Sequence, residues 1–359
     1  MKVYNVELKN IADVNMSNWQ ITHVVNSFTV ANNKFDVLNK MNKLINDGMD
    51  KKNIFIVDKS FSFNTNYSTY FDGDFVNDRG NYIDVQKLFY MGNFTPMESS
   101  ETLQKINILF EVFKRLNSVF SNNFKMRLKT NLLVDAFDSL IKNDIEQCMQ
   151  ELIVDIEDMM LEIYQNQKKP DYNEMNTLLN KFKGIVDKYK FGYKDTIKDL
   201  NANTKEKFEE LFNSLSRPII GTFDEETNRF DIINAEQMYL NGELADRQIR
   251  LRKVEKNSPV LIVFATVGAM SGLLSYLAYR SYQVDLLSEE AEEDNTIPDS
   301  DSKAVSNVLS SSEGVALNNM RNIETDEDIQ RLGLNNFKKM VEVTDKKMKI
   351  DITAIPESE

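Results

Sequence analysis

The chain has 359 residues, of which 42% are hydrophobic and 28% are charged, so it is long enough for two modest domains and has the composition of a globular protein. Its formal net charge of −13 argues against a nucleic-acid-binding surface, because phosphate contacts need clustered lysine and arginine. The single cysteine, Cys148, and the single histidine, His23, exclude an intramolecular disulfide and the Cys/His sites of structural zinc or haem.

Residues 1–95 are expected to form a mixed α+β region. β-favouring runs at 3–8 and 53–57 predict two strands, and an amphipathic pattern at 34–45 predicts a helix that stops near Gly48. Between 61 and 90 the aromatic residues are separated by Asp-Gly and Arg-Gly turn signals. This pattern predicts strands and hairpins.

Residues 96–216 are expected to form a helical bundle or coiled-coil region, so the predicted fold class is mainly α. Thr95 followed by Pro96 is typical of a helix cap and first-turn proline, and predicts a helix that begins there. The apolar residues of this helix recur at steps of three and four, at Leu103, Ile106, Phe110, Phe113, Leu116 and Phe120.

A second long helix is predicted over 128–167. Its apolar seam has the same spacing and consists of Ile141, Ile145, Cys148, Leu152, Ile156, Met159 and Ile163. Pro170 ends this helix, and a third helix through Tyr189 is expected to fold back as its antiparallel partner. A further helix is predicted over 204–215.

The C-terminal third is expected to attach the chain to a membrane. Residues 217–257 are predicted to be a basic juxtamembrane connector, 258–281 a transmembrane helix, and 282–359 an acidic, largely disordered tail. Twenty uncharged residues from Val260 to Tyr279 carry the helix prediction, since twenty helical residues span about 30 Å. The alternative is a core helix or a hydrophobic loop buried in a soluble assembly. Residues 347–355 alternate apolar and polar, which allows a short strand or a solvated end.

Small residues in the predicted membrane helix favour self-association. Gly268 and Gly272, with Ala265 and Ser275 near the same face, would let two helix backbones approach closely in lipid. The alternative is that these small residues are incidental.

Basic residues precede the apolar run and acidic residues follow it. Arg247, Arg250, Arg252, Lys253 and Lys256 predict contact with anionic lipid headgroups. The basic flank is normally retained in the cytoplasm, which predicts a cytoplasmic N-terminal domain and a tail on the opposite side.

No residue set supports a catalytic, cofactor or metal site, and we expect no cofactor. Glu151, Asp155, Asp158 and Glu162 share one helix face, but no histidine accompanies them, so a solvated face is the simpler interpretation. The acidic residues of 72–78 match a calcium loop only loosely and predict a turn. Cys148 lies in the apolar seam as a small core residue, and His23 has no neighbouring nucleophile pattern.

These patterns predict a membrane-anchored structural or assembly scaffold that binds protein partners through its helical region and self-associates, with no nucleic-acid partner. Its asparagine-, lysine- and isoleucine-rich composition suggests a viral or phage component acting at a membrane. A holin-like or genome-ejection protein that perturbs membranes is one alternative. An enzyme with an unrecognised site in residues 1–95 is another, and a polar pocket there would favour it.

Overall fold

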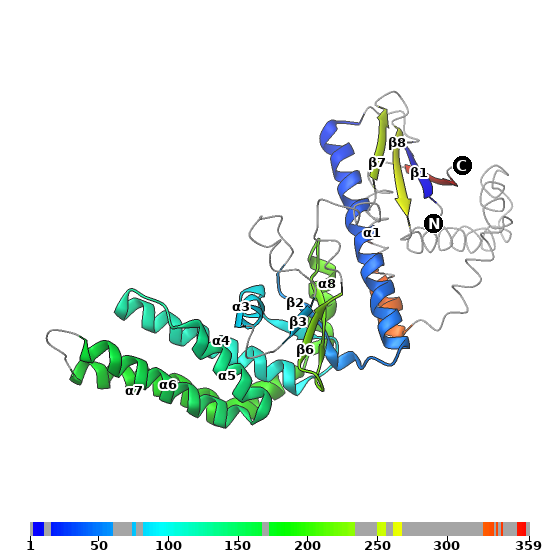
Figure 1. Ribbon diagram of the computed structural model, residues 1–359. Coiled ribbons are helices and arrows are strands. Elements are labelled where there is room, and N and C mark those ends of the chain that lie inside the picture. Colours follow the sequence, from blue (N-terminus) through cyan, green and yellow to red (C-terminus); the bar gives the residue numbers. More distant parts are fainter. Residues whose placement is uncertain are drawn as a thin grey trace. The chain divides into compact units, whose positions relative to one another are not determined.

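The computed structural model describes residues 3–10, 16–59, 74–76, 82–166, 172–233, 250–255, 261–267, 326–333, 335–336, 339 and 350–356. The described part is mainly helical, as predicted, and contains two antiparallel sheets (Figure 1). Contacts divide the chain into two units, of which unit 1 comprises Met1–Gly48 with Tyr239–Glu359 and unit 2 comprises Met49–Met238.

Unit 1 contains a four-stranded sheet assembled from distant parts of the sequence. Its strands lie in the order β7 (Arg250–Glu255), β8 (Leu261–Val267), β1 (Val3–Asn10) and β9 (Ile350–Pro356). All neighbours are antiparallel, with Val6 opposite Phe264 on one side and Ala354 on the other. The predicted strand at 3–8 is therefore confirmed, and it lies in the interior of the sheet.

The apolar run does not begin as a helix. Leu261–Val267 is a β-strand paired to β1 and β7, so the prediction of a continuous helix over 258–281 is wrong for these seven residues. A short apolar run rich in β-branched and aromatic residues suits a buried strand as well as a helix, and periodicity alone does not separate the two. In the described part of the chain, no helix is long and apolar enough to cross a membrane.

The predicted disordered tail also contains ordered structure. Ile350–Pro356 pairs with β1, so the chain supplies its own partner for this strand. Further back, residues 327–333 are helical and lie against α1 (Asn18–Asn46). The Asp326 amide donates to Asn42 Oδ1 at 3.1 Å, and Asn336 Nδ2 donates to the Ala31 carbonyl at 3.0 Å.

Helix α1 is longer than its predicted core but ends where the sequence indicated. Ser17 and Gln20 form a reciprocal capping box at its start, with the Ser17 amide donating to Gln20 Oε1 at 2.8 Å. Gly48 follows its C-terminus with a φ of +99°, a conformation that glycine adopts without strain.

Unit 2 is built on a five-stranded antiparallel sheet. The strand order is β3 (Asp74–Val76), β6 (Arg229–Ile232), β5 (Ile220–Asp224), β2 (Ile54–Val57) and β4 (Phe94–Pro96). The strand predicted at 53–57 is confirmed as β2. Strands β5 and β6 come from a segment that was expected to be a connector, so the sheet joins residues on both sides of the helical region.

A phenylalanine cluster forms the core on one face of this sheet. Phe55 packs against Phe94 and Phe230, with ring centroids 4.8 and 5.9 Å apart. Gly221 lies opposite Phe55, and a Cβ there would meet the Phe55 ring at 2.5 Å, so a larger residue would displace the ring. All four residues of β2 are buried, and because alternate residues of a strand point to opposite faces, both faces of β2 are covered.

The helices of unit 2 are α3 (Tyr82–Met91), α4 (Glu101–Phe124), α5 (Thr130–Lys142), α6 (Ile145–Gln165), α7 (Tyr172–Asn201) and α8 (Thr204–Ser214). α8 contacts β2 and β4, and α4 contacts α5 and α7. The predicted antiparallel pair is confirmed as α6 and α7 (Figure 1). Lys183 meets Glu157 and Lys190 meets Gln150, so positions move in opposite directions along the two helices.

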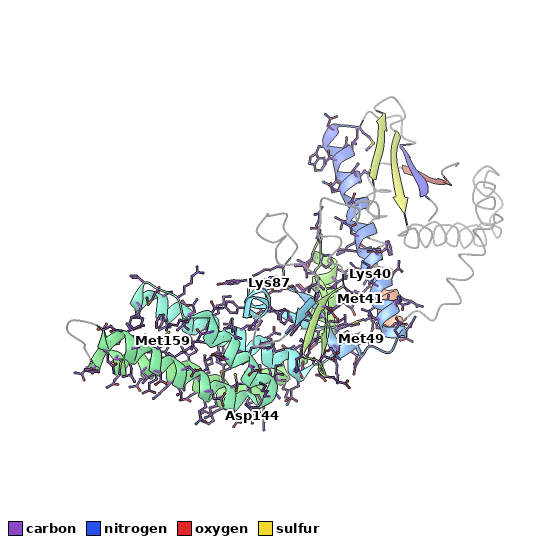
Figure 2. The ribbon with its side chains drawn as sticks, viewed as in Figure 1. Lys40, Met41, Met49, Lys87, Asp144 and Met159 are labelled. Carbon is purple, nitrogen blue, oxygen red and sulfur yellow. The ribbon has the colours of Figure 1, made fainter. Side chains whose placement is uncertain are left out.

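Three predicted boundaries in unit 2 are wrong. Residues 82–91 form helix α3 rather than a strand. Thr95 and Pro96 belong to edge strand β4, and α4 begins at Glu101 after Ser100, whose Oγ accepts the Leu103 amide. The long helix predicted over 128–167 is divided at 143–144 into α5 and α6. Asp144, which Figure 2 labels, caps the new helix by accepting the Gln147 amide at 2.8 Å.

Candidate functional site

The predicted membrane-helix residues do not form a helical face where the structure describes them. Ala265 lies in β8, opposite Asn5 and Arg250 in the sheet register. Gly268, Gly272 and Ser275 lie outside the described residues. Ala265 is therefore not part of the helix-packing face that was predicted from these four residues.

The predicted lipid-contacting cations belong in part to a sheet edge. Arg250, Arg252 and Lys253 lie in β7, which is an outer strand, whereas Arg247 and Lys256 lie outside the described residues. The three cations that the structure describes therefore belong to a strand of the unit 1 sheet.

The acidic residues of α6 are arranged as a solvated face. Glu151 accepts a hydrogen bond from Gln147 at 2.9 Å, and Glu162 lies 3.5 Å from the Lys129 ammonium. Partial burial raises the pKa of Asp155, and the nearby carboxylates add to the effect. Among the described residues, no group of three His, Cys, Asp or Glu side chains is placed to hold a metal ion.

The single cysteine and the single histidine belong to different units of the chain. Cys148 is fully buried on α6 and donates to the Ala136 carbonyl at 3.0 Å, and burial raises the pKa of this thiol to about 12. It is a core residue, as predicted. His23 lies on α1, where its ring stacks on that of exposed Trp19 at 5.5 Å.

A groove of about 450 Å³ opens on unit 2 and is the candidate site. Three parts of the chain line it, namely the residues after β2, the C-terminal end of α3 with the two residues that follow, and one face of α4 with Arg127 beyond it. Its volume falls within the range of ordinary ligand pockets.

The floor near β2 is fixed by a carboxylate and an amide. Asp58 accepts the Asn93 backbone amide at 3.1 Å and the Asn93 side-chain amide at 2.9 Å. Between them, Gly92 has a φ of +131°, and a Cβ there would overlap the Asp58 carboxylate. These hydrogen bonds tie the segment after β2 to the residues that follow α3, and both segments line the groove.

Helix α4 divides its residues between the core and the groove. Its buried stripe contains the predicted positions Leu103, Ile106, Phe110, Phe113, Leu116 and Phe120. The adjacent face carries Glu111, Lys114, Asn117, Ser118 and Ser121 into the groove lining. The chain reverses at Lys125, which has a φ of +56°. Asn117 Oδ1 then accepts the Leu128 amide at 2.9 Å, and this hydrogen bond holds Arg127 beside α4.

One wall of the groove is aromatic. Phe89 meets Phe110 edge to face at a centroid distance of 5.5 Å and Phe113 at 5.7 Å. Its neighbour Tyr90 is 41% exposed. Aromatic faces of this kind provide apolar contact area at low conformational cost.

The charged side chains of the groove differ in their partners: the carboxylates have hydrogen-bond partners, and the cations lack ion-pair partners among the described residues. The two carboxylates are occupied, since Asp58 binds Asn93 and Glu111 accepts Arg115 Nε at 2.7 Å, which raises the pKa of Arg115. Within the described ranges, no carboxylate lies at ion-pair distance from Lys59, Lys114 or Arg127. In the part of the chain that the structure describes, Lys59, Lys114 and Arg127 thus have no ion-pair partner beside the aromatic wall, while Asp58, whose partner Asn93 is neutral, adds an acidic side chain to the same lining.

The side chains that line the groove are acidic, basic, amide, hydroxyl and aromatic. The groove has no histidine or cysteine, because the only ones in the chain lie on α1 and α6. Ser121 Oγ donates to the Ser118 carbonyl at 3.1 Å.

Sequence reasoning did not find this groove, because its lining comes from three segments that only the fold brings together. The polar face of α4 was the one local signal. Comparison with protein-family models, with curated proteins and with solved structures finds no match to this chain. Function must therefore be argued from the groove itself.

Proposed function

We propose that this chain is a structural or assembly protein, not an enzyme, and that it binds a protein partner through the groove of unit 2. The observation that supports this is the set of three cations, Lys59, Lys114 and Arg127, without ion-pair partners in the described part of the chain, next to the aromatic wall. Arginine and aromatic residues are enriched at protein-binding surfaces, where arginine and tyrosine often dominate the binding energy, so Arg127 and Tyr90 support this proposal most directly.

One observation favours the enzyme alternative, and another argues against it. A groove does involve residues before position 95, which is where an unrecognised site was expected. However, the carboxylates that would act as acid or base are held by Asn93 and Arg115. A binding role uses the cations directly, whereas a catalytic role would need these carboxylates to be available.

The test is site-specific photo-crosslinking in cells that produce the protein. A crosslinking residue at Ser118, in the groove, should give one discrete adduct with another protein. The adduct should disappear when Lys114→Glu and Arg127→Glu are introduced together. A crosslinking residue at exposed Lys181 on α7 is the matched control and should not give this adduct. An adduct that survives the double charge reversal would show that partner binding does not use the groove.

Membrane attachment is a separate proposal that depends on the apolar residues after β8, which lie outside the described residues. An anchored scaffold should resist extraction by an alkaline wash and leave liposomes tight, whereas the holin-like alternative should release a trapped dye. Full-length protein that stays monodisperse in the supernatant without detergent would exclude both.

A further inference from the structure

The groove is elongated along α4, which limits the ligands that fill it. Its α4 lining runs from Phe110 to Ser121, which is roughly 16 Å of helix. An extended peptide advances about 3.3 Å per residue, so about five residues lie along this face. A single phosphate or carboxylate is much shorter and would leave the aromatic wall empty.

The aromatic and the basic residues of the lining come from different segments of the chain. Phe89 and Tyr90 of α3 supply the aromatic wall, whereas Lys59, Lys114 and Arg127 come from three other positions of the lining. An extended peptide directs alternate side chains to opposite sides. A peptide that alternates acidic and apolar residues therefore matches both kinds of surface at once.

Charge favours such a peptide over a nucleic acid. The whole chain has a net charge of −13, and Asp58 and Glu111 lie in the lining itself. A nucleic acid brings a phosphate with every nucleotide, which requires many clustered cations. A short acidic segment brings only a few carboxylates, which three cations can balance.

We infer that the groove of unit 2 binds an extended acidic segment of a partner protein, with apolar side chains between its carboxylates. This inference rests on the proposed function, since it names the chemistry of the partner at the same groove. The apolar side chains contact Phe89 and Tyr90, and the carboxylates pair with Lys59, Lys114 and Arg127.

The experiment measures binding of a fluorescein-labelled peptide, Glu-Leu-Glu-Phe-Glu-Leu, to the full chain by fluorescence anisotropy at low salt. Every sample carries Glu289→Gln, Glu290→Gln, Glu292→Gln and Glu293→Gln, so that the acidic stretch of the chain itself does not compete. The peptide should bind, and the same peptide with glutamine in place of glutamate should bind about tenfold more weakly or not at all.

Charge reversal in the groove provides the decisive comparison. Lys114→Glu with Arg127→Glu should weaken binding of the acidic peptide by about tenfold or more, because two attractions become repulsions. Lys181→Glu with Lys188→Glu, on exposed positions of α7, makes the same change in net charge and should alter the affinity less than about twofold. Circular dichroism establishes that both double variants are folded.

Several results would overturn the inference. Equal loss with both double variants would indicate a response to net charge alone, and undiminished binding of the glutamine peptide would remove the role of the carboxylates. Displacement of the peptide by inorganic phosphate or by a single-stranded RNA oligomer at lower concentration would assign the groove to another ligand. If the Ser118 crosslink depends on Lys114 and Arg127 but the acidic peptide does not bind, the ligand class fails and the proposed function stands.

Discussion

Asn107 on α4 completes the outer edge of the sheet in unit 2, and its replacement gives a sharp test of how that edge is held. Among the strands that the structure describes, β4 is the last of the sheet, so none of them lies on the outer side of Phe94. Asn107 takes that place, since its Oδ1 accepts the Phe94 amide at 2.8 Å and its Nδ2 donates to the Phe94 carbonyl at 2.6 Å. Phe94 is only 1% exposed, so bulk water is not available as a substitute partner.

Asn107→Leu keeps the approximate size of the side chain and removes both hydrogen bonds to Phe94, together with the one that Asn107 Nδ2 donates to Gln104 Oε1 at 3.0 Å. Each backbone group left buried without a partner costs about 1–3 kcal/mol, and the added apolar burial returns about 1 kcal/mol. We therefore expect the free energy of unfolding of unit 2 to fall by about 3 kcal/mol. Urea denaturation followed by far-UV circular dichroism measures this change, and hydrogen exchange of a peptide covering residues 90–100 locates it.

Asn123→Leu is the matched control. Asn123 lies on the same helix but is exposed, and its amide donates only to the Val119 carbonyl one turn earlier. This variant should change stability by less than about 0.5 kcal/mol. If Asn107→Leu were equally mild, and exchange over residues 90–100 were unchanged, the side chain of Asn107 would not be what satisfies β4.

Three further predictions follow from individual residues. Gly92→Ala should destabilise unit 2 by about 2 kcal/mol, because the new Cβ overlaps the Asp58 carboxylate and the backbone has a positive φ; a thermal melt checks this, and an unchanged melting temperature would contradict it. Lys34 is buried with its pKa lowered to about 8, first by burial and then by Lys339. Between pH 8 and 10.5 the unfolded chain holds a proton on Lys34 that the folded chain has released, so this residue should make unit 1 more stable as pH rises, by up to about 3 kcal/mol. Comparing urea curves of the native chain and Lys34→Met isolates the effect, and parallel pH dependence in both would refute it. Cys148 should react with a thiol reagent at pH 8 at least about a hundredfold more slowly in the native chain than in urea, because the buried thiol has a pKa of about 12, and fast native labelling would place it at the surface.

Sequence periodicity predicted the helical part of the chain well. A helix that is buried on one side has apolar residues at steps of three and four, and this spacing can be seen in the local sequence. The stripe from Leu103 to Phe120 is buried as expected, and so is the predicted seam from Ile145 to Met159, whereas its end positions Ile141 and Ile163 are only partly buried. What periodicity missed was the interruption at Asn143 and Asp144. The apolar spacing continues across this break, and only the side-chain cap of Asp144 reveals that a new helix starts there.

Pro96 led to a wrong prediction for the start of α4, because both the first turn of a helix and an edge strand tolerate proline. Thr95 and Pro96 fit a helix start in local sequence, but the structure uses Pro96 in an edge strand, where a missing amide donor is also tolerated. The position of β4 at the edge depends on β2, forty residues earlier in the sequence. A local pattern carries no information about that pairing.

The groove was beyond prediction for a similar reason. Arg127 lies beside α4 only because the chain reverses at Lys125 and Asn117 holds the returning segment. Lys59 is positioned by a strand that is separated in sequence from both. Each cation looked like an ordinary surface charge in the sequence, and its meaning depends on which carboxylates lie near it in the fold.

The central position of β1 also changes how membrane attachment has to be tested. β1 pairs with β8 on one side and with β9 on the other, so residues before and after the apolar run belong to one sheet. An arrangement with the N-terminal domain and the tail on opposite sides of a membrane does not fit this sheet, because hydrogen-bonded strands lie about 5 Å apart and a bilayer core is about 30 Å thick.

A fragment ending at 257 would remove both neighbours of β1 and leave two open edges, which favour aggregation whether or not a membrane segment is present. Insolubility of that fragment would therefore say nothing about lipid. The informative comparison keeps the full chain and asks whether alkaline wash releases it, because both neighbours of β1 are then still present.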